Sequence, residues 1–352
     1  MSLIEMPSLA EATAPKFSIA IPVYNRAEYL RQTIASCLAQ TVSNFEVIVS
    51  DDCSTEDLRA VVRSFGDARI FYHRSESRLG ATVNHQTAVS LSKGRYVINL
   101  HSDDMLLPNC LEIAGGELDY RSEAAAVYFA CTYLQGDRVS GSSRVPAVGF
   151  ADQLSLDQYS WLHRFLGVAP SCCLFRKVAF DRIGGYNKAL RIAYDWDLYI
   201  KFLTIGGGVS FLPRILSIYR QHPEQSVQTS SIDGLWDMLE LWPQRDNVHW
   251  SARNLMGLVL TQCGVKMRSS EGLAGIWSMF RELTRRRVFF RLLGGLPPAL
   301  WDKLRARIGF APKEYAGDYI LPAMREEAVE QAKKTVQEQT LLLSLNEAQK
   351  SH

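Results

Sequence analysis

The sequence predicts an α/β protein with a mainly parallel sheet flanked by helices, followed by a helical C-terminal extension. Two observations predict this class. Between Phe17 and about residue 134, short apolar runs alternate with segments whose apolar residues recur at helical spacing. Such alternation is typical of parallel strands joined by crossover helices that cover both faces of the sheet. Beyond about residue 230, helical spacing dominates.

Five apolar runs are the expected strands. Each is rich in β-branched or aromatic residues and is bounded by polar or turn-forming residues. They occupy 17–23, 45–50, 70–73, 95–100 and 124–134. Three helices are expected between them, over 28–40, from about Ser54, and over 82–92. Ser54 and Asp57 are spaced as a capping box at the start of the second helix.

Bulk properties limit the class of protein. The chain has 352 residues, of which 47% are hydrophobic and 22% are charged, values that are ordinary for a globular protein. A formal net charge of +2 gives no support to nucleic acid as a partner, and we expect none. The seven cysteines are odd in number and form no Cys-x-x-Cys pair, which favours buried reduced thiols.

Four segments are expected along the chain. They are a flexible arm (1–15), the α/β domain (16–230), a helical region (231–322), and a charged helical or frayed tail (323–352). The N-terminus does not look like a secretory signal, and no apolar run approaches a membrane span, so we expect a cytoplasmic protein. Phosphate-binding loops of the P-loop and dinucleotide-dehydrogenase types do not follow the first strand, which argues against both classes.

Polar residues follow the first, second and fourth expected strands. They are Tyr24–Asn25, Asp51–Asp52 and Asp103–Asp104. The carboxyl ends of parallel strands meet at one rim of a sheet, where the ligands of α/β proteins bind. We therefore expect these three pairs to converge on one site.

Asp103 and Asp104 are candidates for a cation site. Adjacent carboxylates after a buried strand repel each other unless a cation or hydrogen-bond donors compensate. A divalent ion that bridges a diphosphate would supply that compensation. The alternative is a helix N-cap ahead of Pro108, and the residues alone leave both interpretations open.

The remaining candidates each admit a second interpretation. Asp51 and Asp52 are suited to a nucleobase imide or a ribose hydroxyl, although the residues alone favour a turn or a cap. Asp195 is either a helix cap or a general base that deprotonates an acceptor hydroxyl. His222 is either a surface loop residue, which the sequence alone prefers, or a ligand of metal or diphosphate beside Arg220.

Taken together, these stretches resemble glycosyltransferase family 2, whose members have the GT-A (Rossmann-like) fold. The matching stretches run in the family's order over roughly the first two-thirds of the chain. They are 17–41, 45–57, 78–89, 93–108, 180–202 and 219–226. A single short motif would be weak support, but the ordered set is specific.

The resemblance implies a donor-binding role for residues near the strand ends. Tyr24 and Asp52 would line the pocket for uracil or another base, and Asp103 would hold the ribose or the donor sugar. The residues expected at the donor are Pro22, Tyr24, Asn25, Asp51, Asp52, Arg78, Asn84 and Asp103.

The resemblance also implies the catalytic groups. Asp195 matches the acidic residue that serves the family as catalytic base, and Asp104 would bind Mn²⁺ or Mg²⁺. His222 matches a late histidine that joins the metal or the diphosphate in some members. Contacts to the acceptor or the diphosphate are expected from Gly185, Trp196 and Arg220.

Three departures from the family pattern stand out. His101 occupies a position where the family often has Asp, so the triplet over 101–103 is His-Ser-Asp, and the pair Asp103–Asp104 is kept. Tyr194 precedes Asp195 where an acidic pair is usual. The Gln-x-x-Arg-Trp motif of processive synthases is absent, which favours a non-processive enzyme that adds one sugar.

The implied reaction is an inverting transfer from a nucleotide-diphosphate-sugar, with a UDP-sugar favoured, to a hydroxyl of a saccharide or lipid-linked acceptor. It would serve bacterial-type synthesis of cell-surface polysaccharide or glycolipid. Segment 281–310 holds eight Lys and Arg against Glu282 and Asp302, interleaved with aromatic and aliphatic residues. It suggests peripheral contact with the inner face of a membrane, or else an ordinary basic helix.

Two rival functions remain. A non-catalytic nucleotide-sugar binding or scaffold protein would have the same fold, although the presence of both Asp104 and Asp195 argues against it. A nucleotidyltransferase would be expected to carry a basic, Gly-rich loop after the first strand, where this chain has Pro22 to Tyr29.

Overall fold

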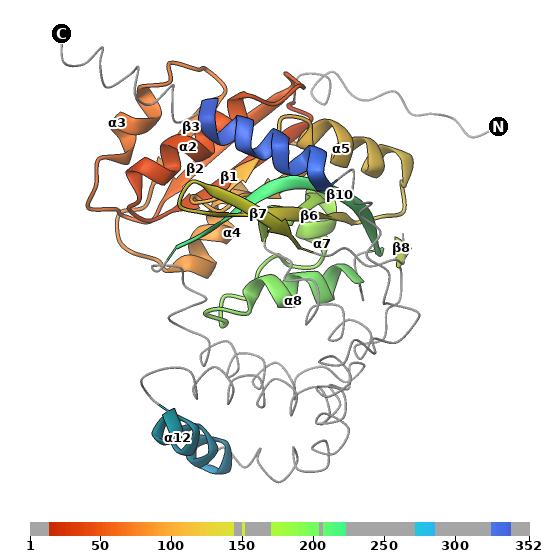
Figure 1. Cartoon of the computed structure of the whole chain (residues 1–352). Coiled ribbons are helices and arrows are strands. Elements are labelled where there is room, and N and C mark those ends of the chain that lie inside the picture. Colours follow the sequence, from red (N-terminus) through yellow and green to blue (C-terminus); the bar gives the residue numbers. More distant parts are fainter. Residues whose placement is uncertain are drawn as a thin grey trace.

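The sheet is the framework of the protein (Figure 1). The computed structural model describes residues 14–143, 150–151, 170–203, 207–222, 272–285 and 325–338. Within them, ten strands form one sheet in the order β3-β2-β1-β4-β9-β6-β10-β5, with β7 paired to β6 and β8 to β10. The strands are β1 (Phe17–Val23), β2 (Phe45–Asp51), β3 (Ile70–Arg74), β4 (Tyr96–Asn99), β5 (Met105–Leu106), β6 (Ala126–Gln135), β7 (Arg138–Ser142), β8 (Phe150–Ala151), β9 (Cys173–Arg176) and β10 (Val209–Gln221).

The α/β class and the five predicted strands are confirmed, and the sheet is more mixed than expected. β3, β2, β1 and β4 run parallel, as the alternation of strands and helices predicts. β9 is inserted antiparallel to both β4 and β6, and β10 runs parallel to β6. The parallel half of the sheet therefore carries the strand ends at which the candidate site was predicted.

Helices cover both faces of the sheet. They are α2 (Ala27–Leu38), α3 (Leu58–Arg63), α4 (Ala81–Leu91), α5 (Cys110–Tyr120), α7 (Lys177–Arg182), α8 (Tyr194–Lys201) and α12 (Gly272–Arg285). A short 3₁₀ turn spans Pro170–Cys172, and residues 325–338 are helical. α2, α3 and α5 contribute to one apolar core, whereas α4, α7 and α8 contribute to the other. In Figure 1, α8 lies beneath the sheet while α2 and α5 lie above it.

The predicted capping box at Ser54 is wrong. Helix α3 begins at Leu58, and its cap is Asp57, whose side chain accepts a hydrogen bond from the Ala60 amide at 3.0 Å. The Ser54 hydroxyl instead accepts the backbone N–H of Asn25 at 2.7 Å. A contact between residues far apart in the chain thus overrides the local capping pattern.

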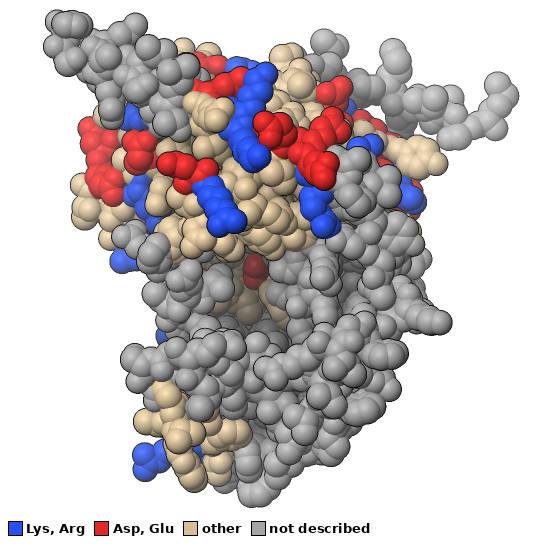
Figure 2. All heavy atoms as spheres, in the orientation of Figure 1, with Lys and Arg blue, Asp and Glu red and all other residues tan. Residues whose placement is uncertain are grey.

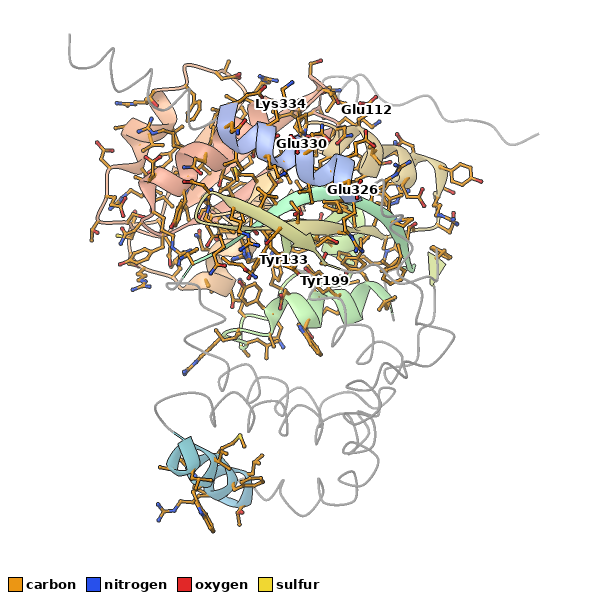
Figure 3. The ribbon with its side chains drawn as sticks, in the orientation of Figure 1. Glu112, Tyr133, Tyr199, Glu326, Glu330 and Lys334 are labelled. Carbon is orange, nitrogen blue, oxygen red and sulfur yellow. The ribbon has the colours of Figure 1, made fainter. Side chains whose placement is uncertain are left out.

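Helix α8 is anchored to the sheet by an aromatic contact. The ring of Tyr199 meets that of Tyr128 on β6 edge to face, with centroids 4.9 Å apart. Figure 3 shows Tyr199 pointing from α8 toward the sheet. Such pairs add about 0.5–1.5 kcal/mol to the free energy of burial. This contact therefore fixes α8, including its first turn, against the core.

Several expectations lie wholly or largely outside the described residues. These are the arm over 1–15, most of the helical region over 231–322, and all of segment 281–310 except its first five residues. The domain boundaries remain predictions. Among the described residues, no helix is long and apolar enough to cross a membrane. In Figure 2, acidic and basic side chains intermingle on the face above the sheet.

Candidate active site

The carboxyl ends of β1, β2 and β4 lie side by side. The parallel register pairs Val23 with Asp51, and Ala20 with Asn99. Residues that follow these three strands are therefore brought to one rim, as predicted. The segment His101–Asp104, called the acidic turn below, leaves β4 at this rim.

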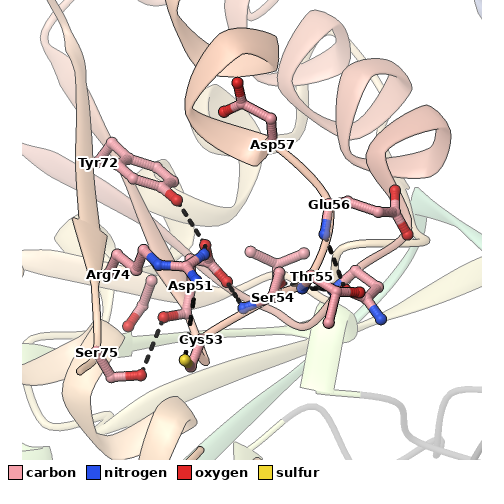
Figure 4. Close-up of polar contacts among 12 residues, drawn as sticks. Asp51, Cys53, Ser54, Thr55, Glu56, Asp57, Tyr72, Arg74 and Ser75 are labelled. Carbon is pink, nitrogen blue, oxygen red and sulfur yellow. Dashed lines mark hydrogen bonds and ion pairs between the residues drawn. The ribbon is translucent and has the colours of Figure 1, made fainter. Parts of the chain in front are cut away.

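Asp51 is a fully buried anchor of the rim (Figure 4). One carboxylate oxygen accepts the Tyr72 hydroxyl at 2.5 Å and the Arg74 guanidinium at 2.9 Å. The other accepts the backbone N–H of Ser54 at 2.9 Å. Burial, and then the bond to this carboxylate, raises the pKa of Tyr72 to about 12. The charge of Asp51 is thus balanced by protein groups.

Asp52 and Asn25 shape the loops around the rim. The carboxylate of Asp52 accepts the backbone amides of Leu79 and Gly80 at 2.6 and 3.0 Å, which fixes the start of α4. Asn25, with a left-handed φ of 57°, accepts the amide of Thr55 at 2.9 Å through its side chain. Asn is one of the residues that tolerate this backbone conformation.

Asn84 and Pro22 support the rim from inside. The amide of Asn84 donates to the carbonyls of Val23 and Ser50 at 3.3 and 2.9 Å and accepts the Ser50 hydroxyl at 2.7 Å. It ties β1 to β2, and its predicted contact with the donor remains a prediction. Pro22 is buried within β1.

Tyr24 and Arg78 form a stacked pair at the edge of the rim. The Arg78 guanidinium lies 3.8 Å from the centre of the Tyr24 ring, which is a close cation–π contact. Arg78 is exposed and Tyr24 is half-buried. This pair offers a flat aromatic face and a positive charge at the place predicted for base and phosphate.

Asp103 is held by two cationic or polar partners. One oxygen, Oδ2, accepts Arg26 Nη1 at 2.6 Å and contacts His222 Nε2 at 3.0 Å. Burial alone would raise the pKa of Asp103, but the bond to His222 and the charge of the Arg26 guanidinium outweigh it and lower the pKa. Among the described residues, the hydrogen bonds to this side chain fall on Oδ2, so Oδ1 has capacity for a ligand.

Asp104 is completely buried. Its oxygens accept the Ser171 hydroxyl at 2.5 Å and the backbone N–H of Arg220 at 3.0 Å. Burial, with the neighbouring charge of Asp103, holds the pKa of Asp104 well above its ordinary value. A divalent cation beside the pair would reverse this effect, because it favours the ionised forms of both carboxylates.

The acidic turn suits a divalent cation. Ligand atoms of His101, Asp103 and Asp104 lie within 4.8 Å of one another. The Nε2 atom of His101 is buried without a hydrogen-bond partner, and burial lowers the pKa of this ring, so that it is neutral. Two carboxylates and a neutral imidazole form a donor set for Mn²⁺ or Mg²⁺, and the nitrogen ligand favours the transition metal.

His222 reaches the turn from the end of β10, as a neighbour of Asp103. Its Nε2 contacts Asp103, its Nδ1 is buried without a partner, and its ring packs 5.1 Å from that of Tyr29. Arg220 also belongs here, because its Nε donates to the Asp103 carbonyl at 2.9 Å. Both late residues are therefore brought to the predicted site.

Asp195 lies in the first turn of α8 and is half-buried. Burial raises its pKa to about 7, which suits a general base near neutral pH. Tyr194, the preceding residue, packs its ring 4.8 Å from His85, and His85 packs 5.2 Å from His101. A single imidazole thus separates the start of α8 from the acidic turn, on the same side of the sheet.

The predicted neighbours of Asp195 differ in character. Trp196 is half-buried and packs against the core formed by α4, α7 and α8. Gly185 has a left-handed φ of +64°, and a Cβ there would also crowd the side chains of Gln86 and Phe180, so the position favours glycine. Contacts of either residue with an acceptor remain predictions.

Sequence reasoning missed three residues of the site: Arg26, Ser171 and His85. Arg26 contacts Asp103, Ser171 contacts Asp104, and His85 contacts Tyr194. Each lies 67 or more residues from its partner. Their spacing in the chain therefore gave no signal. His101 was noted only as a departure from the family pattern, although its place two residues after β4 could have marked it as a ligand.

Comparison with known proteins agrees with this geometry. Residues 18–184 match the sequence profile of the family described as Glycosyl transferase family 2. An uncharacterized glycosyltransferase of Rickettsia typhi is 29% identical over 232 residues, which cover 65% of this chain and 71% of the relative. Chondroitin synthase of Escherichia coli is 29% identical over 199 residues, which cover 54% of this chain but 27% of that enzyme.

Solved structures share the fold. A crystal structure of Staphylococcus aureus TarS superposes with a TM-score of 0.53 at 16% identity and covers 91% of this chain and 90% of its own. The structure of TarS in complex with UDP gives a TM-score of 0.52 at 17% identity, with the same coverage. At this identity the likeness establishes the architecture.

Proposed function

This chain belongs to glycosyltransferase family 2, and we propose that it transfers one sugar from a nucleotide-diphosphate-sugar to a hydroxyl acceptor with inversion at the anomeric carbon. The observation that carries the proposal is the juxtaposition of Asp195 with the acidic turn through His85. It brings a carboxylate with a pKa of about 7 near two carboxylates suited to a cation.

We assign Asp195 as the general base. Its ionised carboxylate accepts the proton of the acceptor hydroxyl as that oxygen attacks the anomeric carbon from the side opposite the nucleotide. Since inversion takes place in one displacement, no covalent enzyme intermediate is required. Because Asp195 is only half-buried, an acceptor can reach its carboxylate. The same partial burial raises the affinity of the carboxylate for a proton.

We assign the acidic turn to the metal and the diphosphate. Asp104, Asp103 and His101 would hold Mn²⁺ or Mg²⁺, with His222 at the edge of the group. A bound divalent cation would neutralise the charge that grows on the departing diphosphate. Arg26 and Arg220 place further positive charge beside this turn.

We assign the base and sugar pocket to the rim at β1 and β2. The Tyr24–Arg78 pair would contact the base and the phosphates, while Asp51, Asp52 and Asn84 hold the surrounding loops. The complex of TarS with UDP supports a UDP-sugar as donor. The chondroitin synthase relative supports a saccharide acceptor in a bacterial surface polysaccharide or glycolipid.

Peripheral contact with the inner face of a membrane is a separate part of the proposal. On α12, Leu273 and Trp277 are 68% and 76% exposed, one helical turn apart, and Arg281 follows at the same spacing. An aromatic and aliphatic pair beside basic residues suits an anionic lipid surface. Flotation with anionic liposomes tests this contact: a Trp277→Ala variant that floats as well as the parent would contradict it.

The test of the catalytic proposal is a screen of nucleotide-sugars with Mn²⁺. We expect one donor to raise the melting temperature and to release nucleoside diphosphate, and transfer to give a product of inverted anomeric configuration by NMR. Asp195→Asn is the control, because it should bind the donor without transferring sugar. Binding with no turnover by the parent on any acceptor would support the binding-protein alternative, and a product of retained configuration would refute inversion.

A further inference from the structure

The buried side chain of His85 joins two parts of the candidate site. Its Nδ1 lies 2.8 Å from the amide nitrogen of Asn99, the last residue of β4. Its Nε2 lies 3.1 Å from the hydroxyl of Tyr194, the first residue of α8. Asn99 stands two residues before His101, and Tyr194 stands one residue before Asp195. One imidazole therefore bridges the strand that ends at the acidic turn and the helix that carries the base.

The placement of the Asn99 amide sets the direction of the hydrogen bonds of His85. An amide nitrogen only donates, so Nδ1 accepts from Asn99 and the ring proton lies on Nε2, from which it is donated to Tyr194. The same amide donates to the hydroxyl of Tyr186 at 2.5 Å. His85, Asn99, Tyr186 and Tyr194 thus form one buried network that joins α4, β4, the segment between α7 and α8, and α8 itself.

Two further contacts from α4 hold the segment that leads to Tyr194. The Thr82 hydroxyl donates to the Leu190 carbonyl at 2.6 Å. The Gln86 side chain accepts the backbone N–H of Tyr186 at 2.9 Å. One face of α4 thus fixes residues 186–194 at three points, of which His85 is the last before Asp195.

Asp195 depends on this support for its position. Its carboxylate accepts hydrogen bonds from backbone amides, with the N–H of Trp196 at 2.8 Å. Among the described residues, no side chain orients it. The start of α8 therefore sets where the carboxylate lies, and Tyr194 is the point at which that start is attached to the rim.

We infer that His85 is a positioning residue that sets the distance between the base Asp195 and the acidic turn, through Tyr194 on one side and Asn99 and His101 on the other. The inference deepens the proposed function and rests on it for the role of Asp195. Reacting groups must be aligned closely, and a displacement of about 1 Å costs as much as 100-fold in rate.

Two substitutions of similar size separate positioning from mere packing. The amide of Gln reaches the place of Nε2, so His85→Gln keeps the bond to Tyr194. The shorter amide of Asn reaches only the place of Nδ1, so His85→Asn keeps the bond to Asn99 and loses Tyr194. Thr87→Ala is the matched control on the same helix, because within the described part of the chain the Thr87 hydroxyl bonds only the Val83 carbonyl of its own helix. Tyr194→Phe removes the same bond from the other side.

Steady-state kinetics and hydrogen exchange are measured on the full chain. For His85→Asn and Tyr194→Phe we expect kcat to fall about 10- to 100-fold with the donor KM within about twofold, because the donor rim is untouched. His85→Gln should retain kcat within about threefold. Amides over 190–200 should exchange about tenfold faster in His85→Asn and at the parental rate in His85→Gln and Thr87→Ala.

The measurements of kcat and of hydrogen exchange distinguish a failure of the positioning role of His85 from a failure of the proposed function. Faster exchange over 190–200 in His85→Asn, in a protein that transfers no sugar, would support the attachment of α8 while refuting the proposed function. Equal loss of kcat in His85→Gln and His85→Asn, with Tyr194→Phe at the parental kcat, would assign His85 to packing alone. Exchange and kcat at parental values in both His85→Asn and Tyr194→Phe would overturn the inference.

Discussion

The substitution Asp195→Asn should raise stability and slow transfer by orders of magnitude in the same protein. Burial raises the pKa of Asp195 to about 7, against 3.8 for an ordinary Asp. Below pH 3.8 the carboxyl is protonated in both folded and unfolded chains. Between pH 3.8 and 7 the unfolded chain loses this proton while the folded chain keeps it, so the stability of the parent falls as the pH rises.

The size of the effect follows from the shift. Each pKa unit corresponds to about 1.4 kcal/mol, so the ionised carboxylate lowers the free energy of unfolding by up to roughly 4 kcal/mol above pH 7. Asn cannot ionise and is free of this cost. The stability of Asp195→Asn relative to the parent should therefore increase between about pH 4 and 7 and then level off. Carboxylates in the acidic turn titrate in both proteins, so their contributions cancel in the difference.

The activity of the parent should change with pH in the opposite sense. The base must be ionised to accept a proton, so kcat/KM should rise through an apparent pKa near 7. Loss of the base should lower kcat about 10²- to 10⁴-fold and remove this limb of the profile.

Urea unfolding at pH 5, 6, 7 and 8 measures the stability difference, and transfer rates over the same range give the profile. Asp181→Asn is the matched control, because Asp181 lies on α7 with its side chain 57% exposed and paired with Lys177. Asp181→Asn should leave the free energy of unfolding within a few tenths of a kcal/mol of the parent at each pH, and the activation free energy of transfer within the same margin. A stability difference for Asp195→Asn that does not depend on pH would refute the assignment of a buried, proton-binding carboxylate.

Three other substitutions test the rim. Ser171→Ala removes the hydroxyl that orients Asp104, and we expect Mn²⁺ affinity, measured by titration followed with electron paramagnetic resonance, to fall about 10- to 100-fold. His101→Asp gives an all-oxygen donor set, and competition binding should show a shift in preference from Mn²⁺ toward Mg²⁺; an unchanged ratio would exclude His101 as a ligand. Asn84→Ala removes three buried hydrogen bonds that join α4 to Val23 and Ser50, and urea unfolding should show a loss of about 2–4 kcal/mol.

Local sequence patterns predicted the parallel half of the sheet because its strands and helices follow one another along the chain. The expected strand over 17–23 is β1 at the same bounds. The patterns did not predict β9, whose pairing with both β4 and β6 joins distant segments. They also missed β10, where the register shifts between Phe211 and Ser217, around Pro213, which lacks the N–H that a regular ladder needs.

The candidate site was predictable to the extent that it consists of residues next to strand ends. The positions of Asp103, Asp104 and Asn25 follow from the strand assignments and from the topology of parallel sheets. The partners of these residues were not predictable, because they depend on which loops face the rim in the folded chain. Ser171 illustrates this, since it lies in a stretch with no regular pattern and yet bonds Asp104, a fully buried carboxylate of the site.

Two pairs of adjacent aspartates at strand ends have opposite roles, although they look alike in the sequence. The carboxylates of Asp51 and Asp52 accept hydrogen bonds from side chains and backbone amides on the neighbouring strand and loops, and all four oxygens have a protein donor. At Asp103 the bonds fall on one oxygen, and the pKa of Asp104 is driven upward. A bound cation would stabilise the first pair least, because the charge of that pair is already balanced by protein donors. It would stabilise the second pair most, because burying unbalanced charge there is costly. The number and kind of donors around each pair, rather than the acidic motif itself, therefore favour Asp103 and Asp104 as the proposed place for the metal.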